Sequence, residues 1–240
     1  MRKDYLPVRK VNNKNSRNVP HNTGSFFSYK MEKEIAYESL SECYFYLFLD
    51  LNKDVERYYP QPVKIRIPVY SAEGNIEYWD HVPDVLVFWN IPNKYPTLFQ
   101  VKYIADFEEK KQQIVNMQCV KYANKHNWEY KVVEIININR VFIKNIKFLH
   151  SHLKERRYFK EIIPDINSVL SKENNLTIEG LSSQLSSRHN ELFILPTIYY
   201  LLAKGEYSFN LFEPIGLKTK IFRGPLIFTL KDDVDGGALM

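Results

Sequence analysis

The chain has 240 residues, of which 45% are hydrophobic and 25% are charged, and its formal net charge is +5. This balance is typical of a globular protein with enough chain to bury a core, so wholesale disorder is excluded. Two cysteines are too few for a disulfide scaffold or a four-thiolate zinc site, and no apolar run reaches the ~18 residues of a membrane span. The start of the sequence has no signal-peptide core, so we expect a cytoplasmic protein without a membrane partner.

The positive charge is concentrated in two stretches. Residues 1–30 carry seven basic residues and one acidic residue, and residues 140–160 carry the same numbers, so each stretch has a local charge of +6. The segment between them has a local charge of −4, and residues 161–240 have −3. Two basic stretches on either side of an acidic segment are typical of a protein that binds a polyanion through the basic stretches. A disordered basic leader and a solvated helix face would produce the same charges.

The first half of the chain predicts a mixed α/β domain. Residues 1–25 are rich in Asn, Ser, Lys and Arg and predict an extended arm, and the spacing of apolar residues predicts an amphipathic helix over 31–50. The further predicted elements, in chain order, are a half-buried strand at 63–67, a turn at 73–75, strands at 85–89 and 98–102, a helix at 105–126 and a strand at 130–136.

The second half predicts a smaller α+β unit. A helical segment at 140–160 leads into it, and Thr177 is the predicted N-cap of one of its helices. The further predicted elements are helices at 165–171, 177–185 and 192–203 and strands at 207–212, 218–222 and 226–230. Three helices followed by a hairpin are the layout of a winged helix.

One group of polar residues points to chemistry. Pro83-Asp84 opens a strongly apolar strand, and Gln100-Val101-Lys102 closes the next one. Side chains alternate along a strand, so Gln100 and Lys102 are expected on one face, with Val101 behind them. Glu38 and Glu42 lie four residues apart on the predicted helix and so share a helical face. The group therefore predicts a compact charged cluster on one face of a sheet.

This order of glutamate, Pro-Asp and X-Val-Lys resembles the restriction-endonuclease-like nuclease core. In such a core, oxygen ligands hold Mg²⁺ against the scissile phosphate, the metal activates the attacking water, and a second ion can help the leaving oxygen depart. A lysine beside the metal orients or helps to deprotonate that water. Here that lysine would be Lys102.

The sequence also resembles TnsA, the endonuclease subunit of heteromeric cut-and-paste DNA transposases, over most of its length. Gln100 adds specificity, because most nucleases of this fold carry Asp or Glu there, whereas TnsA proteins carry Gln-Val-Lys. The matching stretches are Ser16-Arg17-Asn18-Val19, Phe27-Ser28-Tyr29-Lys30-Met31, Tyr37-Glu38-Ser39-Leu40-Ser41-Glu42, Gln61-Pro62, Val82-Pro83-Asp84, Phe99-Gln100-Val101-Lys102 and Asn145-Ile146-Lys147-Phe148-Leu149.

The resemblance implies a role for each site residue. Glu38 would bind metal and Asp84 would bridge two Mg²⁺ ions, for which Mn²⁺ can substitute. The side-chain oxygen of Gln100 and the carbonyl of Val101 would complete the coordination, with Lys102 as the catalytic lysine. We expect Glu42 to be an exposed helix glutamate and His81 to be a loop histidine that bonds to backbone groups.

The resemblance also implies a reaction and partners. The chain would cut the 5′ ends of the element in double-stranded DNA, while an integrase-like transposase cuts and joins the 3′ ends and an AAA+ regulator acts with both. The predicted parts are a basic arm (1–30), a restriction-endonuclease-like nuclease domain (31–150) and a winged-helix-like protein-interaction domain (151–240). The protein would be bacterial and associated with the nucleoid when bound to DNA. The predicted DNA-binding side chains are Arg9, Lys10, Lys14, Arg17, Lys147, Arg156 and Arg157.

Two other readings stay open from the sequence. The first is a free-standing restriction or Holliday-junction nuclease of the same fold, which would cut DNA without a partner. The second is a catalytically idle DNA-binding scaffold subunit that keeps the cluster of polar residues.

Overall fold

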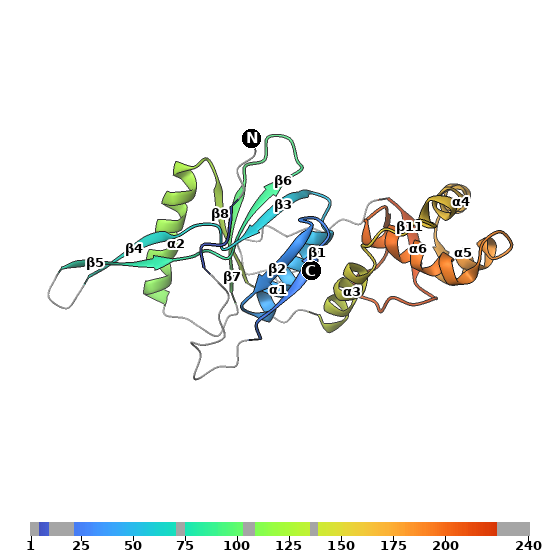
Figure 1. Ribbon diagram of the computed structural model, residues 1–240, viewed down its shortest axis with the longest axis horizontal. Helices are drawn as coiled ribbons and strands as arrows, with labels where there is room; N and C mark the ends of the chain where they lie inside the picture. Colours follow the sequence, from blue (N-terminus) through green and yellow to red (C-terminus); the bar gives the residue numbers. More distant parts are fainter. Residues whose placement is uncertain (1–4, 10–21, 71–74, 103–108, 135–138, 225–240) are drawn as a thin grey trace. The chain divides into compact units, whose positions relative to one another are not determined.

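The computed structural model describes residues 5–9, 22–70, 75–102, 109–134 and 139–224 (Figure 1). The chain divides into two compact units. The first contains residues 1–46 and 54–136, and the second contains residues 47–53 and 137–240. Within the described ranges, no helix is long and apolar enough to cross a membrane.

A four-stranded mixed sheet forms the centre of the first unit. Its strand order is β3-β6-β7-β8. β3 (Val55–Pro60), β6 (Val85–Trp89) and β7 (Thr97–Lys102) are antiparallel neighbours, whereas β8 (Glu129–Glu134) runs parallel to β7. Parallel strands need a crossover connection, and α2 (Glu109–Lys125) lies in the chain between β7 and β8. The predicted mixed α/β class is therefore confirmed.

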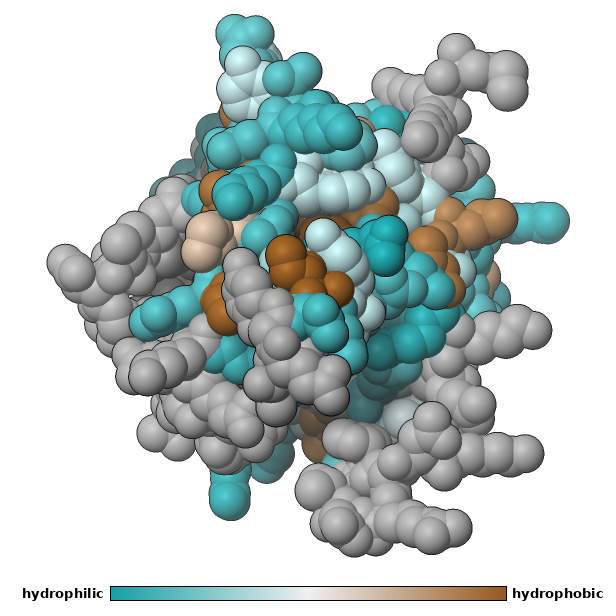
Figure 2. All heavy atoms as spheres, turned by 90° about the vertical axis from the view of Figure 1, so that its left-hand side faces the viewer, coloured by the Kyte–Doolittle hydropathy of each residue, from teal (hydrophilic) through white to brown (hydrophobic). Residues whose placement is uncertain are grey.

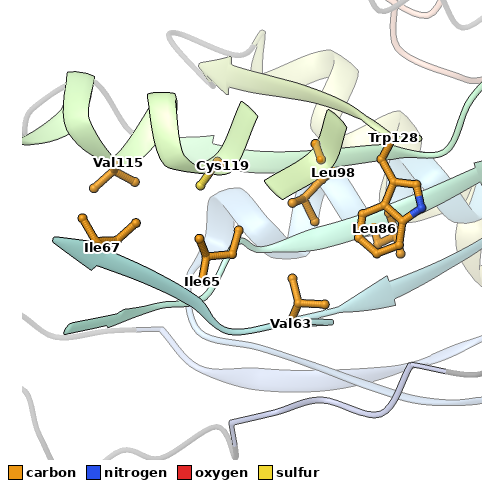
Figure 3. Close-up of a cluster of buried hydrophobic side chains, with 9 residues drawn as sticks. Val63, Ile65, Ile67, Leu86, Leu98, Val115, Cys119 and Trp128 are labelled. Carbon is orange, nitrogen blue, oxygen red and sulfur yellow. The ribbon is translucent and has the colours of Figure 1, made fainter. Parts of the chain in front are cut away.

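The two faces of this sheet are covered by different helices. Leu86 of β6 and Leu98 of β7 lie opposite each other in the strand register and belong to a core cluster that includes Cys119 of α2 (Figure 3). Because side chains alternate, Phe99 lies on the other face, where its ring contacts that of Phe45 in α1 (Leu40–Leu51) at 5.3 Å. The ends of β6 and β7 are thus fixed by packing on both sides.

Two antiparallel hairpins complete the first unit. One pairs β1 (Gly24–Ser28) with β2 (Lys33–Tyr37), and the other pairs β4 (Ile65–Tyr70) with β5 (Ile76–His81). The predicted strand at 63–67 is confirmed from residue 65, and of the predicted turn at 73–75 only residue 75 lies inside the described ranges. On the face that carries this hairpin and α2, apolar patches are interspersed with hydrophilic surface (Figure 2). The large exposed aliphatic side chains of these elements are Val69, Ile76, Ile114, Met117 and Val120.

The helix predicted over 31–50 is wrong over 31–39, nearly its first half. Ile35 belongs to β2, where the burial of alternate side chains and the pairing with β1 are those of a strand. The helix begins at Leu40. The hydroxyl of the preceding residue, Ser39, accepts a hydrogen bond from the Glu42 N–H (3.1 Å). This is the contact of an N-cap residue, and it ends the extended segment. Glu38 therefore lies just before the helix and not on it.

The other predicted elements of the first unit agree with the structure within a few residues. The strands at 85–89 and 98–102 are β6 and β7. The helix at 105–126 is α2, although residues 105–108 lie outside the described ranges, as do residues 135 and 136 of the strand that corresponds to β8.

The second unit contains helices and a small sheet. Its elements are α3 (Arg140–Ser151), α4 (Phe159–Lys172), β9 (Leu176–Thr177), α5 (Ile178–Leu185), α6 (Glu191–Ala203), β10 (Tyr207–Ser208) and β11 (Lys220–Arg223). The sheet is antiparallel with the order β10-β11-β9, and α4, α5 and α6 contact one another. Ile162, Leu181 and Ile198, one from each of these helices, lie in the buried core.

The predicted N-cap of α5 is confirmed, because the Thr177 hydroxyl accepts a hydrogen bond from the Gly180 N–H at 3.0 Å. Three predicted bounds were wrong. The helical segment at 140–160 stops at Ser151, α4 starts earlier than residue 165, and the strand at 207–212 has only two residues. The strand predicted at 226–230 lies outside the described ranges.

Candidate metal and DNA site

The centre of the candidate site is the carboxylate of Asp84, at the start of β6. The Asp84 N–H donates to the carbonyl of Phe99 in β7 at 3.0 Å, which sets Asp84 beside the last residues of that strand. Its carboxylate accepts hydrogen bonds from the Val101 N–H at 2.6 Å and from Nε2 of Gln100. The structure therefore brings together the two sequence segments, 16 residues apart, that were predicted to form a cluster.

The main chain of Asp84 is held as firmly as its side chain. Its carbonyl accepts hydrogen bonds from the hydroxyl of Tyr46 (3.0 Å) and from the N–H of Gln61 (2.8 Å). Gln61 follows β3, is buried, and has a φ of +48°, which is unusual for a residue with a side chain. Such backbone strain persists only where the surrounding contacts fix it.

The Asp84 carboxylate is buried beside other carboxylates. Burial raises its pKa well above the usual range, and Glu42 and Glu38 raise it further, whereas the Val101 N–H and Arg9 lower it. A buried negative charge in this setting is costly unless a cation balances it. The position therefore suits a carboxylate that holds a cation.

Glu38 and Glu42 differ from their predicted places. Glu38 precedes α1 and forms an ion pair with Arg9. Glu42 was predicted to be exposed but is buried, because its carboxylate turns back to accept hydrogen bonds from the Glu38 N–H (3.0 Å) and the Ser39 hydroxyl (3.1 Å). It thus caps α1, and burial raises its pKa. Glu42 holds the backbone next to Glu38 in place.

Gln100 and His81 present buried polar atoms to this region. Among the residues that the structure describes, Oε1 of Gln100 and Nε2 of His81 are buried without a hydrogen-bond partner. His81 ends β5 and is not in a loop, which corrects its prediction. Burial lowers the pKa of its imidazole, as do the positive charges of Lys102 and Arg9, while an interaction with Gln100 raises it. The sequence places His81 three residues before Asp84, but this spacing alone did not predict that His81 belongs to this group.

The donor set fits a hard divalent cation. The predicted oxygen donors are the carboxylates of Glu38 and Asp84, Oε1 of Gln100 and the carbonyl of Val101, and of these Oε1 of Gln100 is buried without a hydrogen-bond partner among the described residues. In the described part of the chain, no three His, Cys, Asp or Glu side chains are grouped so that they could hold a metal ion. A cation at this place would therefore need amide and carbonyl oxygens as well, which Mg²⁺ accepts together with water. Lys102 ends β7, two residues beyond Gln100, and is half-buried.

The predicted DNA-binding residues divide between the two units. Arg9 is in the first unit, and Lys10, Lys14 and Arg17 lie outside the described residues. Lys147, Arg156 and Arg157 are in the second unit; the first is exposed on α3, and the other two are exposed between α3 and α4.

Comparison with known proteins finds one family to which part of the second unit is similar. Residues 137–211, from the start of α3 through β10, match a family model of a transposase endonuclease domain, described as TnsA endonuclease C terminal. No curated protein matches the chain. The match confirms the resemblance to TnsA proteins over these residues and supports a TnsA-type transposase endonuclease subunit.

Proposed function

We propose that this protein is the endonuclease subunit of a heteromeric DNA transposase and cuts the 5′ ends, the non-transferred strands, of the transposon in a Mg²⁺-dependent reaction. The observation that carries the proposal is the Asp84 carboxylate, bound by Gln100 and Val101 at the ends of two neighbouring strands. The family match in the second unit supports the same function.

The fold of the first unit supports a restriction-endonuclease-like core. Its elements follow the chain order α1, β3, β6, β7, α2 and β8, and the sheet order β3-β6-β7-β8 follows the same sequence, with the β4–β5 hairpin inserted after β3. In this core Asp84 begins the second strand of the sheet and Lys102 ends the third. This order supports the predicted pattern for Asp84 and Lys102, whereas Glu38 lies before α1 and not on it.

The proposed mechanism assigns one task to each residue. Glu38, Asp84, the Oε1 of Gln100 and the Val101 carbonyl would hold one or two Mg²⁺ ions, or Mn²⁺ in their place. When bound, the ions would stabilise charge on the phosphate and lower the pKa of the attacking water. Asp84 stays in one orientation because two N–H donors of β7 fix its carboxylate. Lys102 would hold the attacking water and balance the phosphate charge.

The second unit would dock a partner protein. The chain order α4, β9, α5, α6, β10, β11 and the sheet order β10-β11-β9 support a winged-helix fold. Residues 161–240 have a local charge of −3, which disfavours insertion into the major groove of DNA. The proposed partners are an integrase-like transposase and an AAA+ regulator, on double-stranded transposon ends in the bacterial cytoplasm.

Strand-resolved cleavage tests this function. The full chain is mixed with its transposase partner, Mg²⁺ and a transposon-end duplex labelled separately on each strand. We expect cleavage at the 5′ end of the element, and only when the partner is present. Cutting of simple or branched duplex by the chain alone would identify a free-standing nuclease. An intact 5′ strand in a complex that still cuts the 3′ ends would identify a scaffold subunit.

A second experiment tests the basic arm. Replacing Lys10, Lys14 and Arg17 with Gln removes three positive charges, and if all three contact phosphates, the slope of log K against log [salt] for duplex binding should become shallower by about 2.7. The measurement is DNA affinity at several salt concentrations. The control variant replaces three exposed lysines of the second unit, Lys172, Lys218 and Lys220, with Gln. An equal slope for the wild type and the arm variant would contradict a DNA-binding role for the arm.

A further inference from the structure

The short segment of residues 5–9 is anchored next to the candidate site. Tyr5 packs its ring against three aromatic rings of the first unit, those of Tyr59, Phe88 and Trp128, at centroid distances of 5.5, 6.2 and 5.7 Å. Three residues later, the Val8 N–H donates to the carbonyl of Gln61 at 3.0 Å. Part of the predicted arm is therefore packed on the domain.

Gln61 connects this segment to Asp84. Its carbonyl accepts from Val8, and its N–H donates to the carbonyl of Asp84. Two successive backbone hydrogen bonds thus set the position of Val8 relative to the central carboxylate. The left-handed φ of Gln61 directs both of its backbone groups to these partners.

The anchoring of residues 5–8 places the next residue, Arg9, at the candidate site. Its guanidinium forms an ion pair with the carboxylate of Glu38, and the charge of Arg9 acts on Asp84, Glu42 and His81 as well. The side chain of Arg9 is 49% exposed and that of Glu38 is 26% exposed, so solvent and a ligand can both reach the pair. An arginine with five donors suits either a carboxylate or a phosphate.

We propose that Arg9 neutralises Glu38 while the site lacks a divalent cation and turns to a DNA phosphate when the cation binds. This inference rests on the proposed function, because it needs both a cation at Glu38 and DNA at the site. The guanidinium and the cation compete for one carboxylate, so cation binding releases Arg9 beside the place where the phosphate arrives. The negative charge of Glu38 is thus always balanced, first by the Arg9 guanidinium and then by the divalent cation.

The first test measures cation binding without DNA and without cleavage. Isothermal titration of the full chain with Mn²⁺ compares the wild type with Arg9→Gln. Because the variant has no competing guanidinium, we expect it to bind Mn²⁺ about 3- to 10-fold more tightly. Arg188→Gln is the matched control, since Arg188 is an exposed arginine that also pairs with a carboxylate, that of Asp165 at 3.6 Å in the second unit.

A second variant keeps the proposal testable if Arg9→Gln does not fold correctly. Tyr5→Ala removes the aromatic anchor and leaves Arg9 and Glu38 intact, so it should also raise Mn²⁺ affinity, by a smaller factor. Equal or weaker Mn²⁺ binding by both variants would overturn the proposal. No Mn²⁺ binding by the wild type would overturn the proposed function with it, so the two failures are distinguishable.

The final test separates this role from a merely structural one. Duplex binding is measured in Ca²⁺ and in EDTA for the wild type and for Arg9→Gln. We expect the variant to lose about 3- to 10-fold in DNA affinity in Ca²⁺ and to match the wild type in EDTA, where Arg9 is engaged by Glu38. If Arg9→Gln lost the same DNA affinity in both buffers, or lost none in Ca²⁺, the proposed move of Arg9 from Glu38 to a DNA phosphate would be wrong.

Discussion

Replacing Asp84 with Asn is expected to reduce 5′-strand cleavage by the reconstituted complex by roughly 10³-fold or more. The amide keeps the shape of the side chain and can still accept the hydrogen bond from the Val101 N–H. It removes the negative charge that the proposed mechanism uses to hold the divalent cations. Cleavage is measured on the same strand-labelled substrate, with 3′-end cutting by the partner as the internal reference.

The same substitution should leave the fold intact. Burial and the neighbouring Glu42 raise the pKa of Asp84, so the folded state disfavours its charged form more than the unfolded state does. Ionising Asp84 therefore costs stability in the folded state, and a neutral amide is expected to keep or raise the midpoint of thermal unfolding in the absence of metal. Asp80→Asn is the control, because Asp80 is an exposed residue of β5. Full 5′-strand cleavage by the Asp84 variant would contradict the active-site assignment.

Replacing Asn145 with Ala is expected to cost about 3 kcal/mol of stability, the largest effect predicted for a residue outside the candidate site. Asn145 is buried in α3, and its Nδ2 donates to the carbonyls of Leu211 and Glu213, each at 2.8 Å. Its Oδ1 accepts from the Ile215 N–H at 3.3 Å. Alanine would leave these three backbone groups without their partner, and unpaired buried polar groups are costly.

Thermal unfolding checks the Asn145 prediction. For a chain of this size, a loss of about 3 kcal/mol corresponds to a decrease of about 6 to 12 °C in Tm. Lys144→Ala is the matched control, because Lys144 is the preceding residue of the same helix and is exposed. A variant of Asn145 that unfolds at the temperature of the control would show that the three hydrogen bonds contribute little.

The central pair of strands could be predicted because its signals are local. The apolar run after Asp84 and the one that ends at Lys102 are both bounded by polar loops, and alternation along a strand fixes which residues share a face. Pairing the two strands was enough to bring Asp84 to Gln100 and Val101. The only further assumption was that strands consecutive in the chain are neighbours in the sheet.

The surroundings of that pair could not be predicted because they depend on distant contacts. Glu42 was expected in solvent, yet the backbone before α1 folds back so that its carboxylate caps the helix. Arg9 lies 29 residues before Glu38 in the chain, and nothing in the local sequence indicates that the two meet. His81 was expected in a loop, but it pairs with Ile65 of β4 as the last residue of β5.

The second unit was predictable in its helices and less so in its strands. Thr177 and the apolar spacing after it mark α5 in the sequence. The strands β9 and β10 have two residues each, which is too short for an alternating pattern to be recognised. Asn145 was noticed only as part of a matching stretch, because its partners are 66 to 70 residues further along the chain.

The left-handed backbone of Gln61 implies a trade-off between stability and function. A non-glycine residue at a φ of +48° gives up conformational energy of about 1 kcal/mol, and a glycine would recover it at this position. Glycine would also make the peptide more mobile, and the main chain of Asp84 would lose a rigid neighbour. The protein therefore retains a less stable local conformation in exchange for fixed geometry, which is how rigid sites on natural scaffolds are maintained.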